Sequence, residues 1–320
     1  MDTDQHGYKS HEARCMLPKV HGKHIWQEIT TDFMDSHDIY DQVRAHYSTA
    51  SQNNSAEYGS AIAKSFGYSD EELASIPTGS NLGLSCGNPL AIASIREGET
   101  VIDLGSGAGF DAFLASSRVG PSGKVIGVDM NKDMLAKANK IKSETSKANV
   151  TFVESRITDM AALGSGMANC IISNCVINLV PAAEKHLVFN EMFRLLKPGG
   201  RLAISDILAK KPLPETLRSD IAMYVGCISG ASEVHEYEQF LQDAGFREIL
   251  ISDTKSDLNV YIQTNNDGSK KADCCIPSGV GKSTSNRAMD LCVPNRSCES
   301  LTDTDLNEWV GSFKVYAVRE

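Results

Sequence analysis

A regular alternation of short apolar segments and helical segments begins near residue 98, and it constrains the possible folds more than any other feature. The apolar segments predict five strands, at 100–105, 124–130, 150–155, 169–175 and 201–207. The segments 111–119, 131–146 and 182–196 have helical patterns. Strands that alternate with helices of these lengths form parallel sheets through right-handed crossovers. The sequence therefore predicts an α/β fold built on a parallel sheet.

The residues that follow the fifth strand are predicted to complete this sheet. An insertion is expected at 208–245, and its last helix should stop at Gly245, because glycine readily adopts the left-handed conformation of a helix end. Strands are predicted at 246–254 and 259–265, with only "KSDL" between them. A connection this short cannot hold a crossover helix, so we expect a hairpin at the end of the sheet. The final residues, 313–320, are predicted as a terminal strand.

Composition divides the chain into three regions. We expect a polar N-terminal arm with short helices at 1–60, a central domain at 61–265 and a cysteine-containing C-terminal region at 266–320. The arm contains six of the eight histidines, but their spacing matches no zinc-binding pattern. A short helix is predicted within the arm at 39–48.

The overall charge and hydrophobicity exclude several classes of protein. A hydrophobic content of 41% and a charged content of 22% over 320 residues are typical of a globular protein with a large core. The net charge of −10, without a marked cluster of Lys or Arg, argues against binding to nucleic acid. We find no uninterrupted run of 18 apolar residues and no apolar secretory signal near the N-terminus. We therefore expect a cytoplasmic protein that does not span a membrane.

A glycine-rich loop follows the first predicted strand. The stretch "VIDLGSGAGFD" places Asp103, Gly105, Gly107 and Gly109 at a strand-to-helix turn, where glycines let the backbone approach a ligand. Asp129 ends the second strand, where an acidic residue can accept both ribose hydroxyls of an adenosine. The third glycine comes two positions after the second instead of three, and this spacing fits a dinucleotide pyrophosphate poorly. A Rossmann-like oxidoreductase is therefore the weaker alternative.

The loop "DLGSGAG", with an acidic residue two positions before the first glycine, resembles the first motif of class I S-adenosylmethionine-dependent methyltransferases. Seven strands ending in a hairpin are characteristic of that family, and the resemblance covers about residues 98–265. It implies a seven-stranded, Rossmann-like sheet with a terminal hairpin and S-adenosylmethionine as the methyl donor. The cofactor-binding residues that it implies are Asp103 near the amino-acid end, Gly105, Ser106, Gly107 and Gly109 along methionine and ribose, Asp129 at the ribose, Met130 and Ile157 at the adenine, and Asn174 near the methionine moiety.

The nine cysteines form the second group of candidate functional residues. Their odd number in a chain of this length is atypical of a secreted disulfide scaffold, so we expect free thiols. Cys175 ends the fourth predicted strand, where ligands bind in open α/β sheets. Cys86 precedes the first strand, and Cys227 lies in the insertion. All three could converge above the donated methyl group, although buried packing is the simpler role for any one of them alone.

The sequences around these three cysteines suggest a substrate. The strings "NLGLSCGNP", "ISNCVINLVP" and "YVGCISGA", together with "WVGSFKVYAV", closely resemble arsenite S-adenosylmethionine methyltransferases over about residues 40–320. The resemblance implies an arsenic detoxification enzyme that methylates arsenite and then methylarsenite. It also implies that Cys86, Cys175 and Cys227 are the catalytic ligands of As(III).

The chemistry of arsenic agrees with this hypothesis. Trivalent arsenic is thiophilic, and soft thiolates select soft ions. Three thiolates can hold As(III) in a pyramid and leave its lone pair free to attack a methyl group. Transfer then needs alignment and exclusion of water, and no general base, because the nucleophile has no proton to lose.

The sequence also departs from the family. Typical members carry a fourth cysteine between a "V-[KR]-x-x-Y"-like helix and the Cys86 position, and the matching stretch "VRAHYSTASQNNSAEYGS" has none. We therefore expect three working thiols and an external reductant such as glutathione or thioredoxin, with Cys15 as the candidate substitute for the missing cysteine. We also expect the protein to be a monomer. Cys170 is predicted to pack in the core. The tail cysteines have either an arsenic-gathering or a purely local role, and they are Cys274, Cys275, Cys292 and Cys298.

Three alternatives stay open from the sequence. The first is a methyltransferase that acts on another small molecule, such as a quinone precursor, with the thiols as packing. The second is a zinc site in which His235 joins the three cysteines, although these ligands are scattered along the chain. The third is a thiol-based binding protein whose glycine loop is vestigial, and the intact set of loop glycines and acids argues against it.

Overall fold

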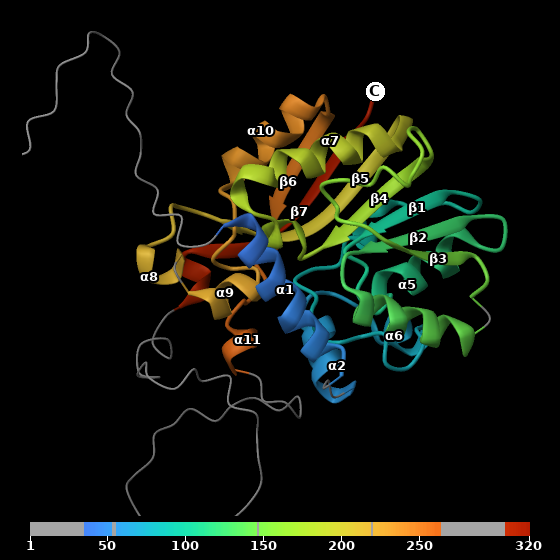
Figure 1. The fold of residues 1–320 in the computed structure, drawn as a ribbon, viewed down its shortest axis with the longest axis horizontal. Coiled ribbons are helices and arrows are strands. Elements are labelled where there is room, and N and C mark those ends of the chain that lie inside the picture. The colour runs from blue at the N-terminus through green and yellow to red at the C-terminus, as the bar shows by residue number, and fades with distance from the viewer. Residues whose placement is uncertain (1–34, 53–55, 146, 219, 264–304) are drawn as a thin grey trace, which may run out of the picture. The chain divides into compact units, whose positions relative to one another are not determined.

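The computed structural model describes residues 35–52, 56–145, 147–218, 220–263 and 305–320 (Figure 1). These residues belong to a single compact unit. No helix among them has the length and apolar character needed to cross a membrane.

A seven-stranded sheet forms the centre of the unit. Its strands are β1 (Thr100–Leu104), β2 (Lys124–Asp129), β3 (Val150–Glu154), β4 (Ala168–Asn174), β5 (Leu196–Ala209), β6 (Arg247–Asp253) and β7 (Val310–Val318). Their order across the sheet is β3-β2-β1-β4-β5-β7-β6. The pairs from β3 to β5 are parallel, and β7 runs antiparallel to both of its neighbours. The predicted α/β fold with seven strands is confirmed.

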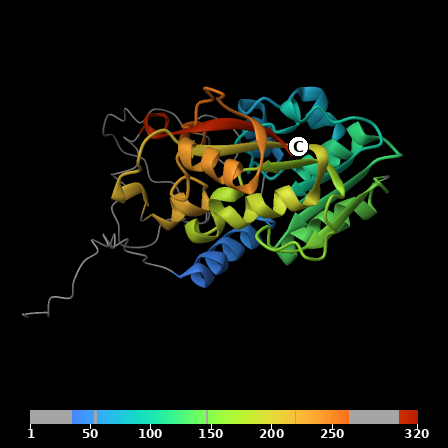
Figure 2. The ribbon, with the colours of Figure 1, turned by 90° about the horizontal axis from the view of Figure 1, so that it is seen from above.

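Helices cover both faces of the sheet. On one face, α7 (Lys185–Leu195) and α10 (Val234–Ala244) pack on β4, β5 and β6 (Figures 1 and 2). On the other face lie α4 (Leu90–Ala93), α5 (Phe110–Val119) and α6 (Lys132–Ser143). Successive residues of β1 point to opposite faces, so Ile102 joins the first core and Val101 the second. This two-sided burial explains why β1, β2 and β4 are mostly apolar.

Several short elements lie beyond these two layers. The helices are α1 (Ser36–Ala50), α2 (Ala56–Ser65), α3 (Asp70–Ser75), α8 (Glu215–Arg218), α9 (Ile221–Val225) and α11 (Val260–Gln263), with 3₁₀ turns η1 (Ile177–Leu179), η2 (Ala182–Glu184) and η3 (Leu306–Glu308). The predicted helix at 39–48 corresponds to α1. The helix of the insertion, α10, ends at Gly245 with a φ of 101°, as expected from its sequence.

The predicted hairpin is wrong in its second strand. Residues 260–263, which were expected to be extended, form the short helix α11. The antiparallel partner of β6 is instead β7, whose register runs along nine residues of β5 on its other side. A long strand that pairs on both edges satisfies more backbone hydrogen bonds than the short segment after "KSDL" can. The terminal strand predicted at 313–320 is therefore real, and it lies inside the sheet.

The three-region division of the chain stays a prediction. The described part of the region 266–320 contributes β7 to the central sheet, and α1 from the region 1–60 packs against α6, α9 and η1. Residues 1–34 and 264–304 lie outside the described residues.

Candidate functional site

A cavity opens at the carboxyl ends of β1, β2 and β4, where ligands bind in open α/β sheets. Its volume is about 1050 Å³, including its open mouth. The walls contain all but one of the predicted cofactor-binding residues, namely Asp103, Gly105, Ser106, Gly107, Asp129, Met130, Ile157 and Asn174. Gly109 is the exception, since it precedes α5 and does not line the cavity.

The glycine loop adopts a backbone that few other residues tolerate. Gly105, Gly107 and Gly109 have φ values of 68°, 50° and 92°. A Cβ atom on Gly105 would lie 2.4 Å from a methyl carbon of Val176, and one on Gly109 would lie 2.7 Å from the Phe113 ring. Glycine is required at both positions because of conformation and close packing together.

Asp129 ties this loop to the second strand. One carboxylate oxygen accepts a hydrogen bond from the Gly107 N–H at 2.8 Å, and the other accepts one from the Asn131 N–H at 2.8 Å. Burial raises the pKa of Asp129 despite these bonds. The predicted contact of Asp129 with a ribose stays a prediction.

The floor of the cavity is acidic. Asp103 is buried, and its Oδ2 has no hydrogen-bond partner among the described residues. Burial raises the pKa of Asp103 well above its usual value, and the nearby Asp111 and Asp129 carboxylates raise it further. A buried carboxyl with one unpartnered oxygen, beside two other acids, favours a ligand that brings positive charge.

One face of α1 forms a wall of the cavity that the sequence analysis missed. Tyr40, Val43, Arg44 and Tyr47 all line the cavity, and their spacing is that of one helix face. The Arg156 guanidinium, from the loop after β3, lies 4.3 Å from the centre of the Tyr40 ring, and both residues line the cavity. The spacing was visible in the sequence, but it could not show which surface the helix covers.

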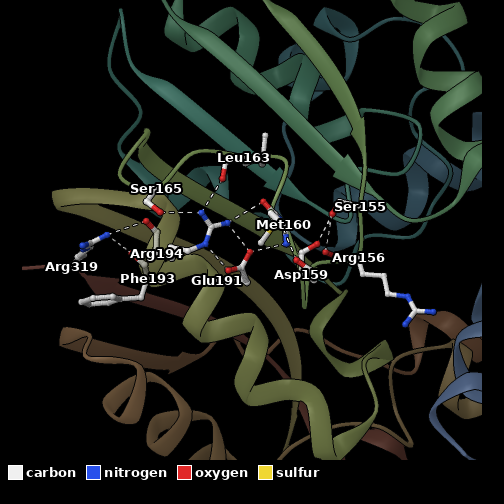
Figure 3. A network of polar contacts seen from close by, with 11 residues as sticks. Ser155, Arg156, Asp159, Met160, Leu163, Ser165, Glu191, Phe193, Arg194 and Arg319 are labelled. Atoms are coloured by element: carbon white, nitrogen blue, oxygen red, sulfur yellow. Dashed lines mark hydrogen bonds and ion pairs between the residues drawn. The ribbon is translucent and has the colours of Figure 1, made fainter.

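A polar network holds the loop after β3, which carries Arg156 and Ile157 (Figure 3). The Arg194 guanidinium of α7 donates to the carbonyls of Met160 and Leu163 and is paired with Glu191. Glu191 in turn accepts from the Met160 N–H at 2.7 Å. The network therefore fixes this part of the cavity wall to the helix layer.

The three predicted arsenic ligands lie in one buried cluster at the inner end of the cavity. Cys86, Cys175 and Cys227 pack in the same core and are 0%, 7% and 1% exposed. The Sγ atoms of Cys86 and Cys175 lie within 4.8 Å of each other and of an Asp206 carboxylate oxygen. The Cys227 thiol donates to the Cys175 carbonyl at 2.9 Å. Only Cys175 of the three lines the cavity itself.

The thiols of the cluster are held in their protonated form. Burial raises the pKa of Cys86 to about 12 and that of Cys175 well above its usual value. The pKa of Cys227 is also raised well above its usual value, by its contact with the Cys175 thiol and by burial. Burial likewise raises the pKa of the neighbouring Asp206 to about 7. The site thus has low polarity and suits a neutral, thiophilic ligand better than a hydrated ion.

Two of the three cysteines have an unusual backbone. Cys175 and Cys227 have φ values of 58° and 66°, in a backbone region that residues other than glycine rarely adopt. Such strain costs on the order of 1–3 kcal/mol per residue and is concentrated at functional sites. Three other described residues, Ser94, Glu248 and Lys255, share this backbone region, and Cys175 and Cys227 are the two of the five that lie in the thiol cluster.

The remaining sequence candidates are not part of this cluster. Cys170 is buried in β4 beside the Ala93 carbonyl. His235 has a side chain that is 74% exposed and pairs with Glu233, and the ionisable residue beside the thiols is Asp206. The other candidates lie outside the described residues, and they are Cys15, Cys274, Cys275, Cys292 and Cys298.

Comparisons with known proteins agree with the fold and with the resemblance seen in the sequence. Residues 95–245 match a family model described as a methyltransferase domain. The arsenite methyltransferase of Halobacterium salinarum is 45% identical over 186 residues, which are 58% of this chain and 47% of that protein. A ubiquinone/menaquinone biosynthesis C-methyltransferase, UbiE of Salmonella arizonae, is 34% identical over 126 residues, which are 39% of this chain and 48% of that protein. The matched segments span about half the length of these relatives.

The fold has a counterpart among solved structures. The arsenic(III) S-adenosylmethionine methyltransferase of Chlamydomonas reinhardtii superposes with a TM-score of 0.52 at 24% identity, covering 84% of this chain and 75% of that one. The predicted class I methyltransferase fold is thereby confirmed. The predicted similarity to arsenite methyltransferases is confirmed by the sequence relatives.

Proposed function

We propose that this protein transfers a methyl group from S-adenosylmethionine to trivalent arsenic held by Cys86, Cys175 and Cys227. One observation carries the proposal: three cysteines from distant parts of the chain lie in a single buried cluster, and Cys175 also lines the adjoining cavity. The similarity to arsenite methyltransferases supports the choice of arsenic over other acceptors.

The cavity fits the methyl donor. S-adenosylmethionine, when bound, supplies a methyl group on a positively charged sulfonium, and its amino group is positive as well. The unpartnered Asp103 oxygen and the neighbouring acids offer these charges partners in the cavity floor. We expect Asp103 to hold the amino-acid end, and Asp129 and Met130 to hold the ribose and the adenine.

The thiol cluster provides ligands for arsenic. Arsenite is As(OH)₃, and each of its three As–O bonds can be exchanged for an As–S bond while the thiol proton leaves with the hydroxyl as water. The exchange is balanced, so three protonated thiols need no base to bind arsenite. Soft sulfur ligands then retain As(III) and leave its lone pair available.

Burial of the cluster contributes to the reaction. Cys86 and Cys227 are covered, and Cys175 is the thiol that borders the cavity. Arsenic held by all three is therefore expected to direct its lone pair toward the cavity, where the methyl group would lie. Exclusion of water favours attack on a cationic methyl centre.

The transfer leaves arsenic oxidised by two electrons, so each further round requires a two-electron reductant. We expect an external thiol such as glutathione or thioredoxin to supply these electrons and return the product to As(III). The protein would then methylate arsenite and afterwards methylarsenite, as an arsenic detoxification enzyme of the cytoplasm that acts as a monomer.

The direct test is incubation of the purified protein with arsenite, S-adenosylmethionine and glutathione, followed by chromatographic separation of the arsenic species. Methylated arsenic should appear in proportion to enzyme, and its formation should require all three components. The absence of any methylated arsenic, from a protein that binds S-adenosylmethionine, would refute the proposal.

A second candidate is methylation of another small molecule, such as a quinone precursor. It is favoured by the similarity to the quinone-biosynthesis methyltransferase. In that case methyl transfer to the quinone precursor should survive replacement of Cys175 by serine, whereas transfer to arsenic cannot.

A further inference from the structure

The five residues Asn174–Asn178 do more than supply the Cys175 thiol. They begin at the last residue of β4 and end within the turn η1, and an asparagine stands at each end of them. Each asparagine side chain hydrogen-bonds to a different one of the two remaining cysteines. The segment therefore carries one of the three thiols and hydrogen-bonds to the residues that carry the other two.

Asn174 encloses Cys86. Its Oδ1 accepts the Cys86 N–H at 3.2 Å and the Cys86 thiol at 3.7 Å, and its Nδ2 donates to the Gly87 carbonyl at 2.9 Å. The side chain thus contacts the backbone on both sides of the Cys86 thiol as well as the thiol itself. The thiol has one proton and a second acceptor in range, the Ser205 carbonyl at 3.8 Å, so Asn174 supplies one of the two acceptors that orient the sulfur.

A second pair of residues fixes the Asn174 amide. Its Nδ2 also donates to an Asp111 oxygen at 2.9 Å and to the Tyr68 hydroxyl at 2.9 Å. The Tyr68 hydroxyl donates in turn to the other Asp111 oxygen at 2.6 Å. Because the nitrogen side is committed to these acceptors, the oxygen side must face Cys86.

Asn178 holds the segment that carries Cys227. Its Nδ2 donates to the Cys227 carbonyl at 3.1 Å, to the Ile207 carbonyl and to the Asp206 carboxylate at 3.2 Å. The amide is fully buried, and its Oδ1 has no partner among the described residues. Its contacts are therefore all donations, and one of them supports the strained backbone of Cys227.

Cys175 lies between the two asparagines in a sharp turn. Its own N–H donates to the Ser205 carbonyl at 2.9 Å, and its φ of 58° turns the chain away from the strand direction. The turn directs the two amides toward different neighbours, the segment before β1 and the insertion after β5.

We propose that Asn174 and Asn178 are positioning residues that hold Cys86 and Cys227 around Cys175, so that the segment Asn-Cys-x-x-Asn assembles the arsenic site. The inference rests on the proposed function and extends it by assigning two residues that bind no arsenic themselves. It also connects the two sites, because Asn174 lines the donor cavity while it contacts the Cys86 thiol.

The experiment measures arsenite affinity by equilibrium dialysis, S-adenosylmethionine affinity by calorimetry, and the separate rates of arsenite and methylarsenite methylation. Asn178→Ala should weaken arsenite binding about fivefold or more, the cost of one lost buried hydrogen bond, and should slow both methylation steps. It should leave the affinity for S-adenosylmethionine within about twofold, since Asn178 does not line the cavity.

Asn174→Ala should affect the two methylation steps unequally. Methylarsenite needs only two thiolates, so Cys86→Ser should lose the first methylation and keep much of the second. Asn174→Ala should reproduce that imbalance, whereas a general loss of stability would slow both steps together. Tyr68→Phe keeps the ring that packs on Phe110 but removes the hydroxyl that orients the amide, and should show a weaker form of the same imbalance.

Asn149→Ala is the matched control, because Asn149 also bonds to two backbone carbonyls, between α5 and β3, but lies outside the cavity and the thiol cluster. It should change thermal stability without changing arsenite affinity. If Asn174→Ala and Asn178→Ala bind arsenite as the wild type does, the positioning roles are wrong. If the wild type itself binds no arsenite, the proposed function fails instead, and the two failures are thereby distinguished.

Discussion

The donor cavity and the thiol cluster adjoin each other but are built in opposite ways. The cavity floor comes from one continuous stretch, β1 and its glycine loop, with Asp129 from the next strand holding the loop. The cluster takes one cysteine from before β1, one from the end of β4 and one from the insertion after β5. The unusual backbone is glycine in the cavity and cysteine in the cluster. The cavity thus has a local floor enclosed by walls from α1, the loop after β3 and the end of β4, whereas every member of the thiol cluster comes from a different part of the chain.

Replacing the thiol that borders both regions should have the largest effect. Cys175→Ser should lower the rate of arsenite methylation by about 100-fold or more. Mutation of a residue that merely supports a metal ligand already lowers metal affinity or activity by about 10–100-fold, and Cys175 is proposed as a ligand itself. S-adenosylmethionine affinity should stay close to that of the wild type. Methylation assays and calorimetry on the same preparations measure both. The control is Cys170→Ser, which replaces a buried cysteine of β4 outside the cluster and should keep the activity. An equal loss of arsenite methylation in Cys175→Ser and Cys170→Ser would show that the cluster thiol has no special role.

Alkaline pH should destabilise the cluster more than the cavity. Burial raises the pKa of Cys86 to about 12, so the folded protein keeps this thiol protonated while the unfolded chain ionises it near its ordinary pKa. The resulting stability is complete below the unfolded pKa and is lost as pH rises toward the folded one. The free energy of unfolding should fall by up to about 1.4 kcal/mol per pH unit for this thiol. Urea titrations across pH 7–11 measure how steeply the free energy of unfolding falls with pH, and Cys86→Ser should make this fall less steep. If Cys86→Ser leaves the slope unchanged, the pH dependence comes from other groups.

A change in the cavity should leave arsenic binding intact. Asp129→Asn removes the charge and one of two accepted backbone hydrogen bonds, so S-adenosylmethionine should bind about tenfold more weakly. Arsenite affinity should not change, because Asp129 lies in the other region. Calorimetry with each ligand tests both statements, with the exposed Asp133→Asn as control. A parallel loss of arsenite affinity would show that the two regions form a single binding unit.

The smallest effect concerns backbone strain. Cys227→Gly and Cys227→Ala both remove the thiol, but glycine accepts a φ of 66° without strain. The glycine variant should therefore be more stable than the alanine variant by about 1 kcal/mol. Cys86 has no positive φ, so the order should reverse for Cys86→Gly and Cys86→Ala. Chemical denaturation of the four variants measures their free energies of unfolding. If glycine and alanine rank in the same order at both positions, backbone strain at Cys227 is not the cause of the difference.

The sequence predicted the elements around the cavity well and the far edge of the sheet less well. The parallel strands and the glycine loop were correct because each depends on neighbouring residues. The strand at 259–265 was wrong, because the choice between it and β7 depends on pairing across the sheet with β5 and β6. The wall formed by α1 was missed for a similar reason. The helix was evident from its pattern, but its position over the cavity depends on the packed core.

The roles of Asp206 and Asn178 were also beyond the sequence. Asp206 lies in the second half of β5, and nothing adjacent in the chain indicates that it lies beside two thiols. Asn178 follows Cys175 closely in the sequence, yet its partner Cys227 lies in another part of the chain.

The sequence alone determined the α/β class and the glycine loop, because periodicity and glycine placement act over a few residues, and its resemblance to a known family indicated which three cysteines to test. Tertiary structure decided that these cysteines share one dry cluster, that only Cys175 borders the cavity, and that β7 completes the sheet. These features depend on the pairing and burial of distant segments, whose free energies are set only when the chain has folded.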